Sequence, residues 1–241
     1  MAARPTGSRP AAANDASAST QPDRRILRLA HRGDWRVAPE NSLAALVTGA
    51  LATHADGIEF DVHLASDGTP VVIHDPTLER VQGTDAAVAS LSSEALASLG
   101  VPDLASVLAA VPDSAFLDVE LKVVPNSAVK AALLSARGRT PQDAVVSSFL
   151  PDAVRALGRL LPGWRRWLNS RTLDDDIVAL AQTLQAHGIA AEWRAITPAA
   201  ARRVHDAGLD LVAFTVTREA TVRRLEDLGV MAACVEGRPL D

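Results

Sequence analysis

The 241-residue chain has little or nothing of several features that mark common protein classes. It carries a single cysteine, Cys234, which excludes an internal disulfide and suits a reducing compartment. It has no excess of basic residues, since 24 Lys and Arg stand against 29 Asp and Glu. No cluster of Lys and Arg is interleaved with aromatic residues. The composition therefore argues against a nucleic-acid-binding groove and favours a small molecule as the partner.

Long apolar segments are also missing. No run approaches the roughly 18 apolar residues that cross a bilayer, so we expect no membrane span. Residues 1–22 are rich in Ala, Ser, Thr and Pro and contain no apolar block like that of a signal peptide, so we expect a disordered tail. A transit peptide is the alternative, but the segment has few basic residues. These features predict a soluble protein in the cytoplasm.

The remaining sequence is sufficient for one large hydrophobic core. Hydrophobic residues make up 48% of the chain and charged residues 22%, which is typical of a globular protein. We therefore assign residues 23–241 to a single domain. The sequence does not predict an oligomeric state.

The order of apolar and amphipathic segments predicts the fold class. From Ile26 onward, short apolar runs alternate with segments of helical length, which is typical of parallel strands joined by helical crossovers. We predict eight strands, at 26–30, 57–62, 115–121, 144–147, 164–168, 189–192, 210–216 and 231–235. Predicted helices lie at 43–53, 126–137, 152–160, 174–187, 197–207 and 219–228. This α/β pattern favours a TIM (β/α)8 barrel over an open doubly wound sheet.

Two features predict that the barrel is irregular. Residues 71–74 follow a turn at 66–69 and form a candidate extra strand, inserted after the second barrel strand. After the eighth predicted strand, the chain reaches Asp241 without a full helix.

Acidic residues share one face of the second predicted strand. Glu59 and Asp61 are two positions apart, so their side chains leave the strand on the same side, while Ile58 and Phe60 leave on the other. We expect the carboxylates to point into the barrel, where burial is costly unless a cation shares the space. That cation is either a hard divalent metal or an Arg or Lys side chain. His63 has the same parity, but we expect the strand to end before it and interpret it as a rim residue.

The third predicted strand repeats this arrangement with Glu120 and Lys122. In TIM barrels the carboxyl ends of successive strands meet at one mouth, so Glu120 should converge with Glu59 and Asp61. Three carboxylates suit Mg²⁺ or Ca²⁺ better than zinc, which prefers nitrogen and sulfur ligands.

Histidines end two apolar runs, in ILRLAH at His31 and in PVVIH at His74. A pair of imidazoles beside a metal-bound anion could serve as general base and general acid near neutral pH. Arg32 and Lys122 would hold phosphate oxygens. Together with the carboxylates, these residues favour a metal-assisted site for phosphoester chemistry.

In their order along the chain, these motifs resemble those of the glycerophosphodiester phosphodiesterases. The matching residues are His31-Arg32-Gly33, Pro39-Glu40-Asn41-Ser42, Glu59-Phe60-Asp61-Val62, Asp67-Gly68, His74-Asp75, Glu120-Leu121-Lys122, Ser148-Phe149 and Phe214-Thr215-Val216. The resemblance implies a TIM barrel that uses a divalent metal to hydrolyse glycerophosphodiesters to sn-glycerol 3-phosphate and an alcohol. In such enzymes the glycerol hydroxyl of the substrate is thought to attack phosphorus, and water then opens the cyclic phosphate.

The resemblance also implies residue roles. By position, His31 and His74 match the acid–base pair of the family. The matches to metal ligands are Glu59, Asp61 and Glu120, and the matches to phosphate or glycerol contacts are Arg32 and Lys122.

Four further residues lie near these groups. Glu40 falls on a family position in a loop before a helix, and we interpret it as orienting His31 or Arg32 by hydrogen bonding. The aromatic residues best placed to line the pocket for the alcohol or glycerol are Phe149, Trp193 and Phe214. For Trp193, an ordinary place in the core is an equal alternative.

The chain departs from the family pattern in two places. It has Phe214-Thr215-Val216-Thr217 where Trp-Thr-Val-Asn is usual, and Val235-Glu236-Gly237 where Thr-Asp is usual. Neither change removes a catalytic group, but both leave the shape of the pocket open.

Two other functions are compatible with this sequence. A phospholipase-like enzyme acting on lysophospholipid head groups would need an exposed apolar rim, and the sequence shows no obvious loop of that kind. A non-catalytic barrel that binds a phosphorylated ligand would be expected to have lost an acid or a histidine, whereas all are present here.

Overall fold

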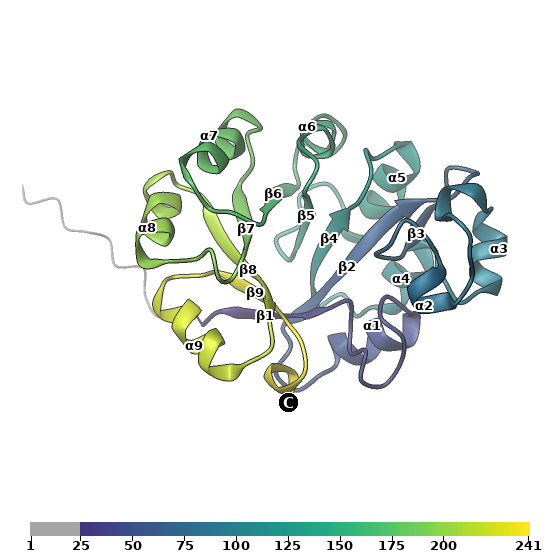
Figure 1. Cartoon of the computed structure of the whole chain (residues 1–241). Helices are drawn as coiled ribbons and strands as arrows, with labels where there is room; N and C mark the ends of the chain where they lie inside the picture. The colour runs from purple at the N-terminus through teal and green to yellow at the C-terminus, as the bar shows by residue number, and fades with distance from the viewer. Residues whose placement is uncertain (1–24) are drawn as a thin grey trace, which may run out of the picture.

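A closed ring of parallel strands forms the centre of the molecule (Figure 1). The structure is a computed structural model and describes residues 25–241, so the predicted tail at 1–22 lies outside the described residues. The eight strands of the ring are β1 (Leu27–His31), β2 (Gly57–Leu64), β4 (Phe116–Leu121), β5 (Ala144–Ser148), β6 (Arg165–Ser170), β7 (Gly188–Glu192), β8 (Asp210–Val216) and β9 (Ala232–Val235). The ring closes because β1 pairs with both β9 and β2. The predicted TIM barrel is confirmed.

Helices surround the ring on its outer side (Figure 1). The six predicted helices are present as α1 (Leu43–Ala50), α5 (Ser127–Arg137), α6 (Pro151–Leu160), α7 (Asp175–Thr183), α8 (Pro198–Asp206) and α9 (Glu219–Asp227). Helix α7 ends earlier than predicted, because Gln185 adopts a left-handed conformation with φ of 52° that an α-helix cannot continue. Within residues 25–241, no helix has the length and apolarity needed to cross a membrane.

An insertion separates β2 from β4. It begins with the predicted extra strand, β3 (Pro70–Val72), which pairs antiparallel to β2 outside the ring. It also contains three short helical segments that the periodicity did not predict, because each has six residues or fewer: α2 (Glu79–Gln82), η1 (Val88–Ser90) and α3 (Ser93–Ser98). The segment ends in α4 (Leu104–Ala110), which was also not predicted; its buried residues belong to the main core and it contacts α1 and α5, so it is the barrel helix of this crossover. After β9 the described residues contain one further helical segment, the single turn η2 (Arg238–Leu240).

Alternation along the strands produces two differently filled faces. Outward side chains such as Ile58, Phe60 and Val119 are fully buried in the main core. A separate cluster fills the amino-terminal end of the barrel interior: Leu29, Phe116, Val145, Trp167, Ala190, Val212 and Ala232. Two positions further along their strands, the same face carries His31, Asp118, Ser147 and Asn169. The apolar layer therefore closes one end of the barrel, and polar groups occupy the interior towards the carboxyl ends, where TIM-barrel sites lie.

Candidate active site

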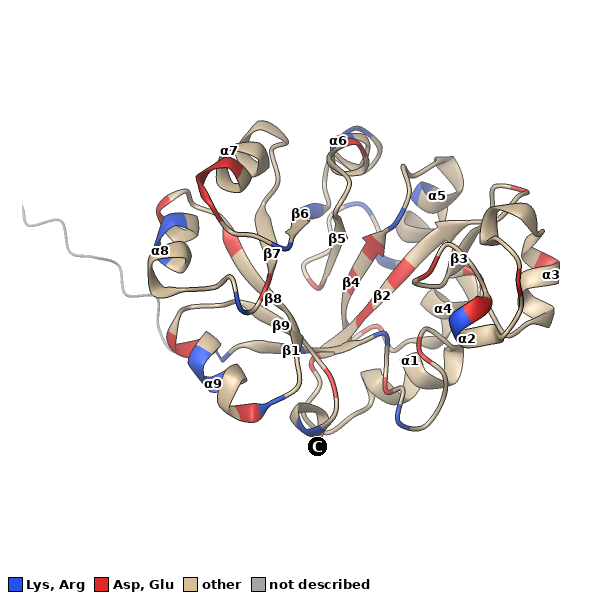
Figure 2. Ribbon diagram, in the orientation of Figure 1, with Lys and Arg blue, Asp and Glu red and all other residues tan. Residues whose placement is uncertain are grey.

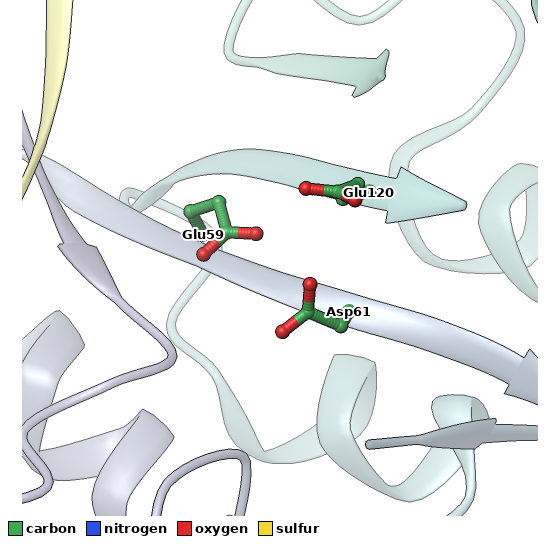
Figure 3. A group of neighbouring side chains, drawn as sticks. All are labelled: Glu59, Asp61 and Glu120. Atoms are coloured by element: carbon green, nitrogen blue, oxygen red, sulfur yellow. The ribbon is translucent and has the colours of Figure 1, made fainter. Parts of the chain in front are cut away.

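Three carboxylates meet in the barrel interior, from two neighbouring strands (Figure 3). Glu59 and Asp61 lie on β2 and Glu120 lies on β4, where it pairs in register with Asp61. All three are buried, and each offers an oxygen within 4.8 Å of the others. Figure 2 shows acidic positions on both strands in the central part of the barrel. The structure thus brings together the three residues that the sequence predicted as metal ligands.

The electrostatics of this cluster fit a divalent cation. The Oε1 atom of Glu59 is buried and has no hydrogen-bond partner among residues 25–241. Burial and the neighbouring carboxylates of Asp61 and Glu120 raise the pKa of Glu59 well above its ordinary value, and burial followed by Asp61 raises the pKa of Glu120 to about 7. Anionic forms are therefore costly unless positive charge is added. Carboxylate oxygens are the ligands that Mg²⁺ and Ca²⁺ prefer, so Glu59, Asp61 and Glu120 are suited to hold such an ion.

Two cationic side chains share the same space. Lys122 places Nζ 2.9 Å from Oδ1 of Asp61 and also contacts Glu120, while Arg32 places Nε 3.3 Å from Oδ2 of Asp61. Although burial opposes ionisation, these cations hold the pKa of Asp61 well below its usual range. Asn41 adds a 2.8 Å hydrogen bond from Nδ2 to Oδ2 of Asp61. Asp61 is thus fixed as a carboxylate between two groups that can also bind phosphate oxygens.

His31 stands at the end of β1 with a carboxylate on each side. Its Nδ1 lies 2.5 Å from Oε1 of Glu236, and its Nε2 lies 3.8 Å from Oε2 of Glu59. Glu236 follows β9 directly, and from the sequence it stood out only as a departure from the family pattern. Glu236 could have been identified as a site residue from its position one residue beyond a barrel strand, since such positions line the mouth of the barrel.

His74 has the same kind of partner. Its Nδ1 lies 2.6 Å from Oδ1 of Asp75, and burial lowers its pKa, so the imidazole is neutral near pH 7 and able to accept a proton. The main-chain oxygen of His74 lies 3.1 Å from Nε2 of His63. The prediction that the strand ends before His63 is wrong, because pairing with β3 extends β2 to Leu64.

One buried carboxyl group of the site, that of Asp118, was not among the residues predicted from the sequence. Asp118 lies on the interior face of β4, two residues before Glu120, and accepts a 2.7 Å hydrogen bond from the hydroxyl of Ser147. Burial is the main cause that raises its pKa to about 7. The alternation in FLDVEL could have identified it, since Asp118 and Glu120 share parity.

The predicted aromatic residues fall into two groups. Phe149 and Phe214 make an edge-to-face contact with ring centroids 5.5 Å apart, and Nζ of Lys122 lies 5.8 Å from the Phe149 ring. Trp193 follows β7 and instead has the guanidinium carbons of Arg194 and Arg224 at 4.5 and 5.7 Å from its ring. Phe149 and Phe214 are thus close to the charged cluster, whereas Trp193 stacks with arginines and packs on the main core.

Glu40 lies in the loop between β1 and α1, as predicted. Its Oε1 accepts a 2.8 Å hydrogen bond from Nη1 of Arg32. Beside Glu40 and His74, a cavity of about 480 Å³ opens between this loop and the insertion. Its other lining residues are mainly apolar and include Val72, Val81 and Leu99.

Comparison with known proteins identifies the family of this chain. Residues 31–236 match the model of the glycerophosphoryl diester phosphodiesterase family. A glycerophosphodiester phosphodiesterase of Caldanaerobacter subterraneus is 27% identical over 86% of this chain and 92% of its own length. Human glycerophosphodiester phosphodiesterase 1 is 39% identical over 33% of this chain and 24% of its own length.

Solved structures share the fold. A phosphodiesterase of Oleispira antarctica, in complex with the product sn-glycerol-3-phosphate, superposes with a TM-score of 0.76 at 24% identity, covering 88% of this chain and 93% of that one. A glycerophosphodiester phosphodiesterase of Agrobacterium tumefaciens has a TM-score of 0.72 at 25% identity, covering 89% and 97%. Since the family match extends from His31 to Glu236, the chain belongs to the glycerophosphoryl diester phosphodiesterase family and is an enzyme of that class.

Proposed function

We propose that this enzyme hydrolyses glycerophosphodiesters to sn-glycerol 3-phosphate and an alcohol, with Mg²⁺ or Ca²⁺ held by Glu59, Asp61 and Glu120. The observation that carries the proposal is the buried cluster of these three carboxylates, whose ligand oxygens lie within 4.8 Å of one another. The product found in the Oleispira antarctica phosphodiesterase supports the choice of substrate. We also propose a cytoplasmic location, since the single cysteine, Cys234, suits a reducing compartment.

The proposed roles follow from charge and geometry. Arg32 and Lys122 bind non-bridging phosphate oxygens, and the cation, when bound, neutralises charge on the phosphoryl group. Both histidines have Nδ1 within hydrogen-bonding distance of a carboxylate, Glu236 for His31 and Asp75 for His74. This contact fixes the ring and leaves Nε2 for proton transfer.

Each histidine then serves one half of the first step. One histidine takes the proton of the glycerol hydroxyl while the oxygen of that hydroxyl forms a bond to phosphorus. The other histidine gives a proton to the oxygen of the leaving alcohol while the bond between that oxygen and phosphorus breaks. Water opens the resulting cyclic phosphate with these roles reversed, which returns both histidines to their starting protonation states.

The direct test is release of sn-glycerol 3-phosphate from a panel of glycerophosphodiesters with choline, ethanolamine, glycerol or inositol as the alcohol. Metal-free protein is compared with protein given Mg²⁺, Ca²⁺ or Mn²⁺. Metal-dependent release supports the proposal, and the panel identifies the preferred alcohol. If folded protein releases no product with any metal but still binds sn-glycerol 3-phosphate, the proposal is wrong and the non-catalytic binding barrel is supported.

A second candidate substrate class is lysophospholipid, and two structural features favour it. The expectation that no apolar loop serves the mouth does not hold, because Trp35 is 47% and Val37 62% exposed in the loop between β1 and α1. That loop also borders the mainly apolar cavity near His74. Comparing a lysophospholipid with its deacylated counterpart tests this class. Faster turnover of the lysophospholipid, lost in the double variant Trp35→Ser/Val37→Ser, would favour it; equal or slower turnover would exclude it.

A further inference from the structure

One arginine of the insertion joins two carboxylates of the site. Arg80 lies on α2, and its Nη1 and Nη2 donate hydrogen bonds of 3.0 and 2.6 Å to the two oxygens of Glu40. Its Nε donates a 2.5 Å hydrogen bond to Oδ2 of Asp75. The guanidinium therefore uses three donors on two carboxylates, and its planar shape holds them in a fixed relation.

Both carboxylates have a second partner in the active site. The Oδ1 atom of Asp75 lies 2.6 Å from Nδ1 of His74, and Oε1 of Glu40 accepts a hydrogen bond from Arg32. Arg80 thus connects the partner of one histidine to the partner of the phosphate-binding arginine.

The contacts of Arg80 with Glu40 and Asp75 are expected to contribute little to the stability of the fold. Arg80 has 49% of its side chain exposed, and helix α2 has four residues, none of them buried. Ion pairs with an exposed partner generally contribute little to the free energy of unfolding, although Glu40 and Asp75 are themselves only 18% and 22% exposed. What the contacts do fix is the position of Asp75 and Glu40, whose negative charges would otherwise repel each other.

We propose that Arg80 is a positioning residue for the phosphodiesterase reaction: it holds Asp75 and Glu40 so that His74 and Arg32 face the substrate correctly. This inference rests on the proposed function. It gives the insertion a part in the reaction, because neither the barrel strands nor the barrel helices supply this cation. Lysine cannot replace it, since an ammonium group lacks the planar fork that contacts both carboxylates.

The test begins with Arg80→Ala. We expect kcat for release of sn-glycerol 3-phosphate to fall by about 10- to 100-fold, as for a misplaced catalytic group, with a melting temperature within about 4 °C of that of wild type. Arg80→Lys should recover little of this loss, whereas guanidinium ion at non-denaturing concentration should recover part of it in Arg80→Ala. Arg155→Ala is the matched control, since Arg155 is also exposed and paired with an acid, Asp152, but lies on α6.

A double-mutant cycle separates positioning from a general structural effect. If Arg80 acts through Asp75, Arg80→Ala should cost much less kcat in an Asp75→Asn background than in wild type. Wild-type kcat in folded Arg80→Ala, or an equal cost in both backgrounds, would overturn the inference. If Arg80→Ala does not fold, Arg80→Gln takes its place in the cycle. Failure of the proposed function is distinguishable, since the wild-type enzyme itself would then release no product.

Discussion

Nδ1 of His31 lies 2.5 Å from Oε1 of Glu236, so the first and last strands of the barrel are joined by a contact between a histidine and a carboxylate. The two residues are 205 positions apart in the chain. They meet because β1 and β9 are neighbours in the closed ring. A carboxylate at this distance accepts a hydrogen bond from Nδ1–H, which favours the tautomer that leaves Nε2 facing the site for proton transfer.

Glu236→Gln should therefore lower kcat without unfolding the protein. The amide keeps the size of the side chain but removes the negative charge and can bind the wrong tautomer. We expect a loss of about 10-fold or more, measured from initial rates at saturating substrate. Asp227→Asn is the control, because Asp227 is an exposed acid on the preceding helix, α9. Equal rates for wild type and Glu236→Gln would show that the contact has no part in the reaction.

Replacement of either histidine should abolish most of the turnover. For His31→Ala and for His74→Ala we expect a loss of about 100- to 10,000-fold, the usual range for a general acid or base. The far-ultraviolet circular dichroism spectrum should not change, since both side chains lie outside the apolar clusters of the core. His205→Ala, at an exposed position on α8, serves as the control. Near-wild-type activity in either variant would disprove the acid–base assignment.

Divalent metal should stabilise the protein as well as activate it. At a free metal concentration 100 times the dissociation constant, binding adds about 2.7 kcal/mol to the free energy of unfolding, which thermal denaturation detects as a higher Tm. In Glu59→Gln this rise should disappear, while the metal-free variant should be at least as stable as metal-free wild type. The reason is that burial and the neighbouring carboxylates oppose ionisation of Glu59 and raise its pKa, whereas the neutral amide carries no such cost.

The control for this experiment is Glu94→Gln, at an exposed position on α3. It should keep the full metal-induced rise in Tm. A rise of equal size in Glu59→Gln would mean that the ion binds without Glu59.

Asp67 should make the stability of the protein depend on acid pH. Its carboxylate accepts hydrogen bonds from the main-chain N–H groups of Thr69 and Ser93 and from the hydroxyl of Ser93, which hold its pKa well below the ordinary value. A pKa that is lower in the folded state gives stability that is present above the unfolded value of about 4 and is lost as the pH falls below it.

Urea denaturation of Asp67→Asn between pH 7 and pH 2.5 tests this. The variant should unfold at lower urea concentration than wild type at pH 7, and the two midpoints should converge below about pH 4. Asp85→Asn, also exposed in the insertion, should follow wild type throughout. A constant difference across this range would show that the hydrogen bonds do not depend on ionisation.

Much of this molecule was determined by local sequence. Alternation of apolar runs with helical segments predicted all eight ring strands, because a strand buried on both faces must be apolar wherever it does not carry a functional group. The same alternation placed Glu59, Asp61 and Glu120 on the interior face, since side chains two residues apart leave a strand on the same side. Asp118 follows the same rule, so its place on the interior face could also have been predicted from the sequence.

Tertiary structure decided the partners of these groups. Glu236 meets His31 because the ring closes, and Arg80 meets both Glu40 and Asp75 because the insertion folds back on the loop before α1. Such contacts cannot be predicted from the periodicity of the sequence. They join residues that are distant in the chain, or they involve a residue on a helix of only one or two turns. The short helices of the insertion belong to the same class: α2 buries none of its residues, so tertiary contacts and not an amphipathic pattern determine where it lies.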